Sequence, residues 1–203
     1  MPRVKVFIDA QNCYRDARRA FFTPADDGPR GQISPRRFGE VLMALRSVPP
    51  DRQITHVRVY TGRPNSTKDP KTYGAHMRQC ARWGGDRDVV VVPRSLRYPR
   101  NWPAEKPQEK GIDVQLAVDL VRGYVADEFD IGIVMSTDTD LLPAIEAVLE
   151  FDKRRGYDPV EVAAWQQHDY SKLLRVAGRN LIGHDLTRNL YNRAADPTDY
   201  NLP

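Results

Sequence analysis

Carboxylates follow two apolar runs that we expect to be buried strands. Asp9 ends the run that begins at Val4, and Asp138 and Asp140 follow the run over residues 131–135. In an open parallel sheet, the carboxyl ends of the strands form the edge at which ligands bind. We therefore expect these acids to meet at one edge of one sheet.

Two further acids lie in the apolar stretch from residue 112 to 125, whose pattern is typical of a helix. Asp113 would lie in its first turn. Asp119 follows six positions later, or about 600° around a helix, so the two cannot share a face at ideal geometry. Apolar residues flank Asp119, where an unpaired charge would be costly. The spacing leaves open whether Asp119 is a direct metal ligand or supports one.

Each acid also has a purely structural role open to it. Asp is a common N-cap, and Asp9 and Asp138 each precede a predicted helix. However, a helix needs one cap, and a cluster of carboxylates is costly unless a cation lies among them. Oxygen ligands without His or Cys suit Mg²⁺ or Mn²⁺.

The strands and helices that would position these acids alternate along the chain. Several of the strands are apolar throughout, which is typical of a parallel sheet covered on both faces. The pattern predicts an α/β fold, a three-layer α/β/α sandwich with a central, mainly parallel sheet. The predicted strands cover residues 4–8, 54–60, 89–92, 131–135, 160–165 and 181–186, and the predicted helices cover 11–22, 36–46, 70–83, 112–125 and 141–151.

Length and composition indicate one globular domain. Of the 203 residues, 40% are hydrophobic and 29% charged, which excludes a disordered chain. We expect the domain to cover residues 1–186 and a polar, loosely held tail to cover 187–203. No apolar run reaches the 18 residues of a membrane span, the first residues lack the apolar core of a signal peptide, and two cysteines make no disulfide framework. These features predict a cytoplasmic protein.

Positive charge is concentrated in the middle of the sequence. The net charge is +4, but residues 62–110 carry 11 Lys and Arg against 5 Asp and Glu, so the rest of the chain is slightly acidic. This basic loop excursion favours a polyanionic partner. An ordinary solvated loop would explain the charge alone equally well.

Three segments that contain these acids resemble the motifs of NYN domains, a branch of the PIN-like nuclease superfamily, and are most similar to its LabA-like group. They are FIDAQN from Phe7 to Asn12, KGIDVQLAVD from Lys110 to Asp119, and STDTD from Ser136 to Asp140. The resemblance covers about residues 3–186. It implies a PIN-like fold and metal-dependent ribonuclease activity. Ala10 and Thr137 replace glycines of the family pattern, and no acid is lost.

The resemblance also implies roles for single residues. Asn12 and Ser136 would orient the acids or the attacking water, and Lys110 would neutralise phosphate charge. Asp119 would be a further catalytic acid. The acids that would hold one or two Mg²⁺ or Mn²⁺ ions are Asp9, Asp113, Asp138 and Asp140.

On this resemblance, the basic segment becomes a candidate surface for single-stranded RNA. Arginines would follow the backbone, and aromatic rings would stack on unpaired bases at about 1–3 kcal/mol per base. Trp102 precedes a proline and would equally serve as an anchor for its loop. The candidate RNA-binding side chains are Arg63, Arg94, Arg97, Arg100, Tyr98 and Trp102, with Lys110.

Two other functions stay open on the sequence. One is a non-catalytic RNA-binding regulatory module that keeps the fold. The other is a nucleotide-sugar transferase whose metal-binding DxD would be Asp138-Thr139-Asp140. The transferase reading leaves Asp9 and Asp113 unexplained, whereas a nuclease uses every acid. The sequence gives no signal for the oligomeric state.

Replacing Arg94, Arg97 and Arg100 together by glutamine tests the basic segment. We expect weaker RNA binding and a shallower dependence of log K on log salt, because each lost phosphate contact lowers the slope by about 0.7 for a single strand. Fluorescence anisotropy with labelled single-stranded RNA at several salt concentrations measures both. Unchanged binding would remove this loop from the path of the RNA.

Overall fold

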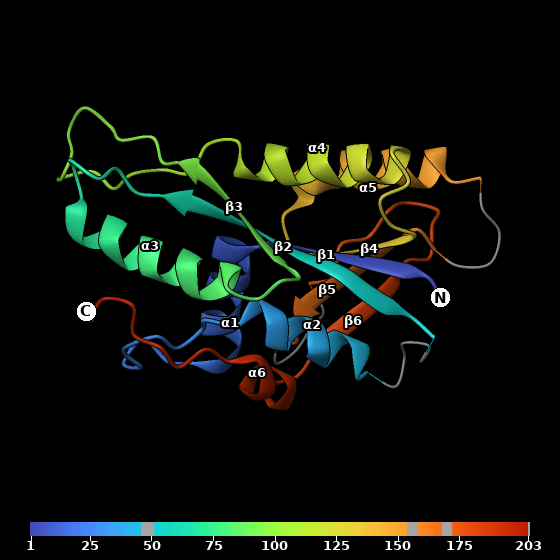
Figure 1. Cartoon of the computed structure of the whole chain (residues 1–203), viewed down its shortest axis with the longest axis horizontal. Helices are drawn as coiled ribbons and strands as arrows, with labels where there is room; N and C mark the ends of the chain where they lie inside the picture. The colour runs from blue at the N-terminus through green and yellow to red at the C-terminus, as the bar shows by residue number, and fades with distance from the viewer. Residues whose placement is uncertain (46–50, 154–157, 168–171, 203) are drawn as a thin grey trace.

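The computed structural model describes residues 1–45, 51–153, 158–167 and 172–202, and shows an α/β fold (Figure 1). Six strands form one sheet. They are β1 (Arg3–Asp9), β2 (Gln53–Arg63), β3 (Val89–Ser95), β4 (Ile131–Met135), β5 (Val160–Trp165) and β6 (Ile182–Leu186).

The strand order is β3-β2-β1-β4-β5-β6, and every neighbouring pair is parallel. The expected α/β fold with a mainly parallel sheet is therefore confirmed. The chain adds β2 and β3 on one side of β1, then returns to place β4 on its other side. This reversal opens a crevice at the carboxyl ends of β1 and β4, where open α/β sheets bind their ligands.

Helices cover both faces of the sheet (Figure 1). They are α1 (Ala10–Phe21), α2 (Pro35–Met43), α3 (Pro70–Gly84), α4 (Ile112–Val125), α5 (Leu142–Phe151) and α6 (Arg188–Ala194). Alternate residues of β1 face opposite ways: Val6 and Ile8 pack in the cluster of α1, α2 and α6, and Phe7 packs in that of α4 and α5. None of the helices in the described ranges is long and apolar enough to cross a membrane.

Several predicted boundaries agree with the structure, notably those of α4, β4 and β5. The helix expected over 36–46 is α2 over Pro35–Met43, and residue 46 lies outside the described residues. The helix expected from residue 141 begins as a short 3-10 turn, η1 (Thr139–Leu141), before α5. Asp138 caps that turn.

The strands β2 and β3 run three residues further than expected. Thr61, Gly62 and Arg63 pair with residues 93–95 of β3, beyond the point where β1 ends at Asp9 opposite Tyr60. These paired extensions project past the carboxyl edge of the sheet. They carry part of the basic segment to one side of the crevice.

The expectation of a loosely held tail over 187–203 is wrong. Helix α6 lies within this segment, and Tyr191 packs in the core. The buried Asp196 accepts hydrogen bonds from the Trp83 indole at 3.4 Å and the Tyr200 hydroxyl at 2.7 Å. Asp196 and Tyr200 are buried despite their polarity, so the polar composition of this segment does not by itself indicate a loosely held tail.

A buried ionic cluster joins β5 and β6 to the residue before β2. The Glu161 carboxylate is fully buried and receives hydrogen bonds from Arg52 at 2.5 Å and His184 at 2.8 Å. Burial alone would raise the pKa of Glu161, but the two partners hold it below the ordinary glutamate value. The ionised carboxylate therefore stabilises the fold.

Replacing Glu161 by glutamine leaves Arg52 and His184 buried without their anion. We expect a loss of about 3 kcal/mol in the free energy of unfolding at neutral pH, or roughly 6–12 °C in Tm. Because the folded pKa is lowered, this stabilisation is present above the ordinary glutamate pKa and is lost as the pH falls through the folded one. Thermal melts over a series of pH values measure the difference.

The matched control is Glu146→Gln on α5, where the carboxylate is exposed. It should leave Tm almost unchanged, since surface charges contribute little. A Glu161→Gln penalty that stays constant down to acid pH would contradict the ionic origin of the stabilisation.

Candidate functional site

The carboxyl ends of β1 and β4 bring Asp9 and Asp138 to the crevice. Each side chain caps the helical turn that follows it: Asp9 accepts from the Asn12 N–H at 3.0 Å, and Asp138 accepts from the Asp140 N–H at 3.0 Å. Both acids therefore act as N-caps, as their positions in the sequence allow. Capping uses one carboxylate oxygen in each case, and the other remains available.

Asp9 is the most constrained of these acids. Only 7% of the residue is exposed, and its pKa is raised, first by burial and then by the charges of Asp138 and Asp113. The N–H groups of Asn12 and Gln11 offset part of this effect. The charges of Asp113 and Asp138 thus act on Asp9 from two other parts of the chain.

Glu109 is a fourth acid of this group that the sequence motifs did not single out. Its pKa is raised to about 7, first by burial and then by Asp9, with a smaller contribution from Asp113. The carboxylate fits beside Gly62, where a Cβ atom would lie 2.8 Å from Glu109 Oε1. We refer to Asp9, Glu109, Asp113 and Asp138 as the acid cluster.

Asn12 connects α1 to the loop after β4. Its Oδ1 accepts from the Thr137 N–H at 3.0 Å and the Thr137 hydroxyl at 3.2 Å. The same hydroxyl lies 2.6 Å from the buried Asp16 carboxylate, which also pairs with Lys172. These contacts fix the loop that carries Asp138. Asp16 was missed, although its place among buried Cys13, Ala17 and Ala20 on one helix face was a usable signal.

Ser136 and Asp140 lie on either side of Asp138. Ser136 is buried, and its hydroxyl accepts from the Asp138 N–H at 3.2 Å. Asp140 is exposed beyond the turn.

Asp119 belongs to a separate network on α4. Its carboxylate contacts the Arg58 guanidinium at 2.7 Å, the Tyr60 hydroxyl at 3.0 Å and the Gln115 amide at 3.0 Å. Gln115 also accepts from Arg94 at 2.8 Å. Arg58 neutralises Asp119 inside the protein, so the geometry favours a supporting role over direct metal binding.

Tyr98 and Trp102 contact each other and other residues of the basic segment. Their rings meet edge to face at 4.9 Å, the Tyr98 hydroxyl accepts from the Asn65 N–H at 3.1 Å, and the Trp102 indole donates to the Lys68 carbonyl at 3.3 Å. Lys68 also lies over the Tyr98 ring. The anchoring role considered for Trp102 is therefore present.

The candidate RNA-binding arginines and Lys110 lie at several places along the basic segment. Arg94 lies over the first turn of α4, within 4.0 Å of where a Cβ of Gly111 would be, and Lys110 is exposed just before this turn. Arg63, at the end of β2, donates to the Ser95 hydroxyl. Arg97 and Arg100 are exposed further along the loop.

The acid cluster has the donor chemistry that Mg²⁺ or Mn²⁺ prefers, since every group is a carboxylate. Within the described ranges, no three His, Cys, Asp or Glu side chains stand close enough together to hold one ion. Mg²⁺ does not require such a cage, because it keeps several waters and is held by one or two carboxylates and substrate phosphates. The mutual repulsion at Asp9 is what a cation would relieve. The carboxylates of the acid cluster therefore fit a Mg²⁺ or Mn²⁺ ion.

A family of known proteins matches most of this chain. The family model of the NYN domain matches residues 3–182, which include all three motif segments. A protein of unknown function from Vibrio parahaemolyticus has a crystal structure with a TM-score of 0.43 and 15% identity, covering 81% of this chain and 80% of that one. No curated protein matches. The LabA-like group stays a prediction.

Replacing Asp9 by asparagine separates its electrostatic cost from its capping role. Asparagine still caps a helix, so α1 keeps its N-terminal hydrogen bond. Because the pKa of Asp9 is raised in the fold, we expect the neutral variant in EDTA at pH 7 to melt a few degrees higher, at roughly 2–4 °C per kcal/mol. Mn²⁺ should raise the Tm of the protein that keeps Asp9 and should leave the Tm of Asp9→Asn unchanged.

The control for this experiment is Asp27→Asn, which changes an exposed carboxylate in the loop after α1. It should respond to Mn²⁺ as the original protein does. A Mn²⁺ shift that survives in Asp9→Asn would contradict the assignment of Asp9 as a metal ligand.

Proposed function

The chain belongs to the NYN domain family of the PIN-like nuclease superfamily, and from this membership and its acid cluster we propose that it is a metal-dependent ribonuclease that hydrolyses phosphodiester bonds. The observation that supports the proposal is that Asp9 ends β1, Asp138 follows the neighbouring parallel strand β4, and the charges of Asp138 and of Asp113 in α4 act on Asp9. Three separate parts of the chain supply these acids.

Mg²⁺ or Mn²⁺ held by these carboxylates would polarise the phosphoryl oxygen and lower the pKa of a bound water to generate the nucleophile. Asp9, Asp113 and Asp138 are the proposed ligands, and the exposed Asp140, two residues after Asp138, is a further candidate. Ser136 and Asn12 hold the Asp138 loop through its backbone. Their proposed role is to keep the ligand geometry fixed.

Positive charge next to these acids supports an RNA substrate. Arg94 lies over the start of α4, and Lys110 precedes that helix. These side chains would offset the phosphate charge on the approach to the acid cluster. Tyr98 and Trp102 bind each other and the neighbouring loop, so we assign them to the shape of the surface and the arginines to contact with the RNA.

Replacing Asp138 by asparagine is the direct test of the activity. We expect cleavage of a mixed single-stranded RNA in Mn²⁺ or Mg²⁺ to fall at least about 100-fold, because one metal ligand is lost while an amide still caps η1. EDTA should abolish cleavage by the original protein. Gel analysis of end-labelled RNA measures the rate.

The control variant Asp27→Asn should cut at the original rate. Equal cleavage by Asp138→Asn would place the activity elsewhere. RNA binding without cleavage by the original protein would favour the regulatory module, and neither binding nor cleavage would favour nucleotide-sugar chemistry.

A further inference from the structure

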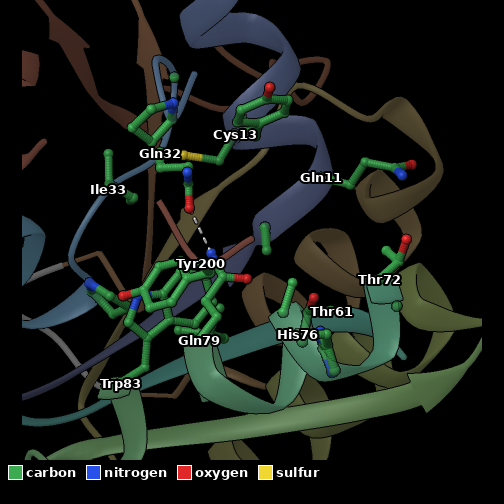
Figure 2. A pocket seen from close by; sticks show the side chains of 18 of the residues that line it. Gln11, Cys13, Gln32, Ile33, Thr61, Thr72, His76, Gln79, Trp83 and Tyr200 are labelled. Atoms are coloured by element: carbon green, nitrogen blue, oxygen red, sulfur yellow. Dashed lines mark hydrogen bonds between the residues drawn. The ribbon is translucent and has the colours of Figure 1, made fainter. Parts of the chain in front are cut away.

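A cavity of about 610 Å³ lies beside the acid cluster, between α1, α3 and the end of β2 (Figure 2). Ala10 and Gln11, which directly follow Asp9, form part of its wall, and Glu109 forms another part. The volume falls within the range of about 300–1,000 Å³ typical of small-molecule sites. The cavity and the acid cluster therefore share one border.

Two aromatic rings in the wall are held rigidly. Trp83 from α3 and Tyr200 from the C-terminal segment both line the cavity, and both donate to the buried Asp196 carboxylate. Asp196 thereby fixes the position of each ring. Flat, fixed aromatic faces are the surfaces on which proteins stack unpaired bases.

The cavity also offers hydrogen-bonding groups. The Gln79 amide donates to Gln32 Oε1 at 2.8 Å, as the dashed line in Figure 2 shows, and the pairing leaves Gln79 Oε1 as an acceptor and Gln32 Nε2 as a donor. Thr61 and His76, only 8% and 7% exposed, add a hydroxyl and a ring nitrogen. One donor and one acceptor side by side match the edge of a base.

The charge of the cavity lining determines which part of a nucleotide the cavity can hold. The described residues that line the cavity include no Lys or Arg, and they include the carboxylates of Glu109 and Asp199. A phosphate would meet no Lys or Arg in this lining, and it would be repelled by the Asp199 carboxylate and by Glu109 whenever Glu109 is ionised. Burial lowers the pKa of His76, which keeps its ring neutral. The lining therefore suits an uncharged, flat ligand with polar edges.

We propose that this cavity binds one unpaired nucleobase of the RNA, next to the phosphate that the acid cluster cuts. The inference rests on the proposed ribonuclease function and adds a determinant of base preference to it. Residues 199–201, which line the cavity, lie beyond the segment matched by the family model.

The experiment titrates adenosine, guanosine, cytidine and uridine into the metal-free protein in EDTA and follows binding by ligand-observed NMR. We expect saturable binding of at least one nucleoside. Gln79→Leu and the near-isosteric Thr61→Val should each weaken it about five- to tenfold, the effect of losing one hydrogen bond. Met77→Leu, at an exposed position of α3, is the matched control and should bind as the original protein does.

Two readouts separate this inference from the proposed function. Asp138→Asn should lose RNA cleavage but keep nucleoside binding, since Asp138 does not line the cavity. RNA cleavage without saturable nucleoside binding up to about 10 mM would overturn the base pocket and leave the nuclease standing. Nucleoside binding that Gln79→Leu and Thr61→Val both retain in full, in proteins with unchanged melting curves, would also overturn it.

Discussion

The position of Asp9 is the constraint on which the other features of the site depend. A central strand of a fully parallel sheet ends in this carboxylate, at the point where the strand order reverses. The neighbouring strand and helix add Asp138 and Asp113, whose charges make ionised Asp9 harder to sustain. The fold tolerates this repulsion in the place where a divalent cation would turn it into binding. Stability and function therefore make opposite demands on the same few side chains.

Three other buried carboxylates pair with cations of the protein. Arg58 and the Tyr60 hydroxyl pair with Asp119, Arg52 and His184 with Glu161, and Lys172 and the Thr137 hydroxyl with Asp16. These groups hold helices and loops against the sheet. The acid cluster differs physically: neighbouring acids raise the pKa of Asp9 and of Glu109, and Arg15 offsets part of this effect at Glu109.

Apolar periodicity predicted the sheet and most of its helices because burial on both faces favours largely apolar runs, of which β4 is one without interruption. Polar residues were harder to place. Asp196 and Tyr200 lie in a segment whose polar composition indicated a solvated tail. In the structure the two side chains are hydrogen-bonded to each other and buried. Glu109 joined the acid cluster through the approach of a loop to Gly62, a long-range contact that no local pattern records.

The all-parallel order also has a kinetic consequence. Asn12 and Thr137 are hydrogen-bonded although they lie 125 positions apart, and β1 pairs with β4 although β2, β3 and the helices α1 to α4 lie between them in the sequence. Such non-local pairing makes folding slow, because loop closure precedes the contacts that stabilise it. A partly folded chain that has joined only β1, β2 and β3 contains Asp9 without Asp138. The complete acid cluster therefore exists only once the two halves of the sheet have come together, so an incompletely folded chain lacks the centre that would cut RNA.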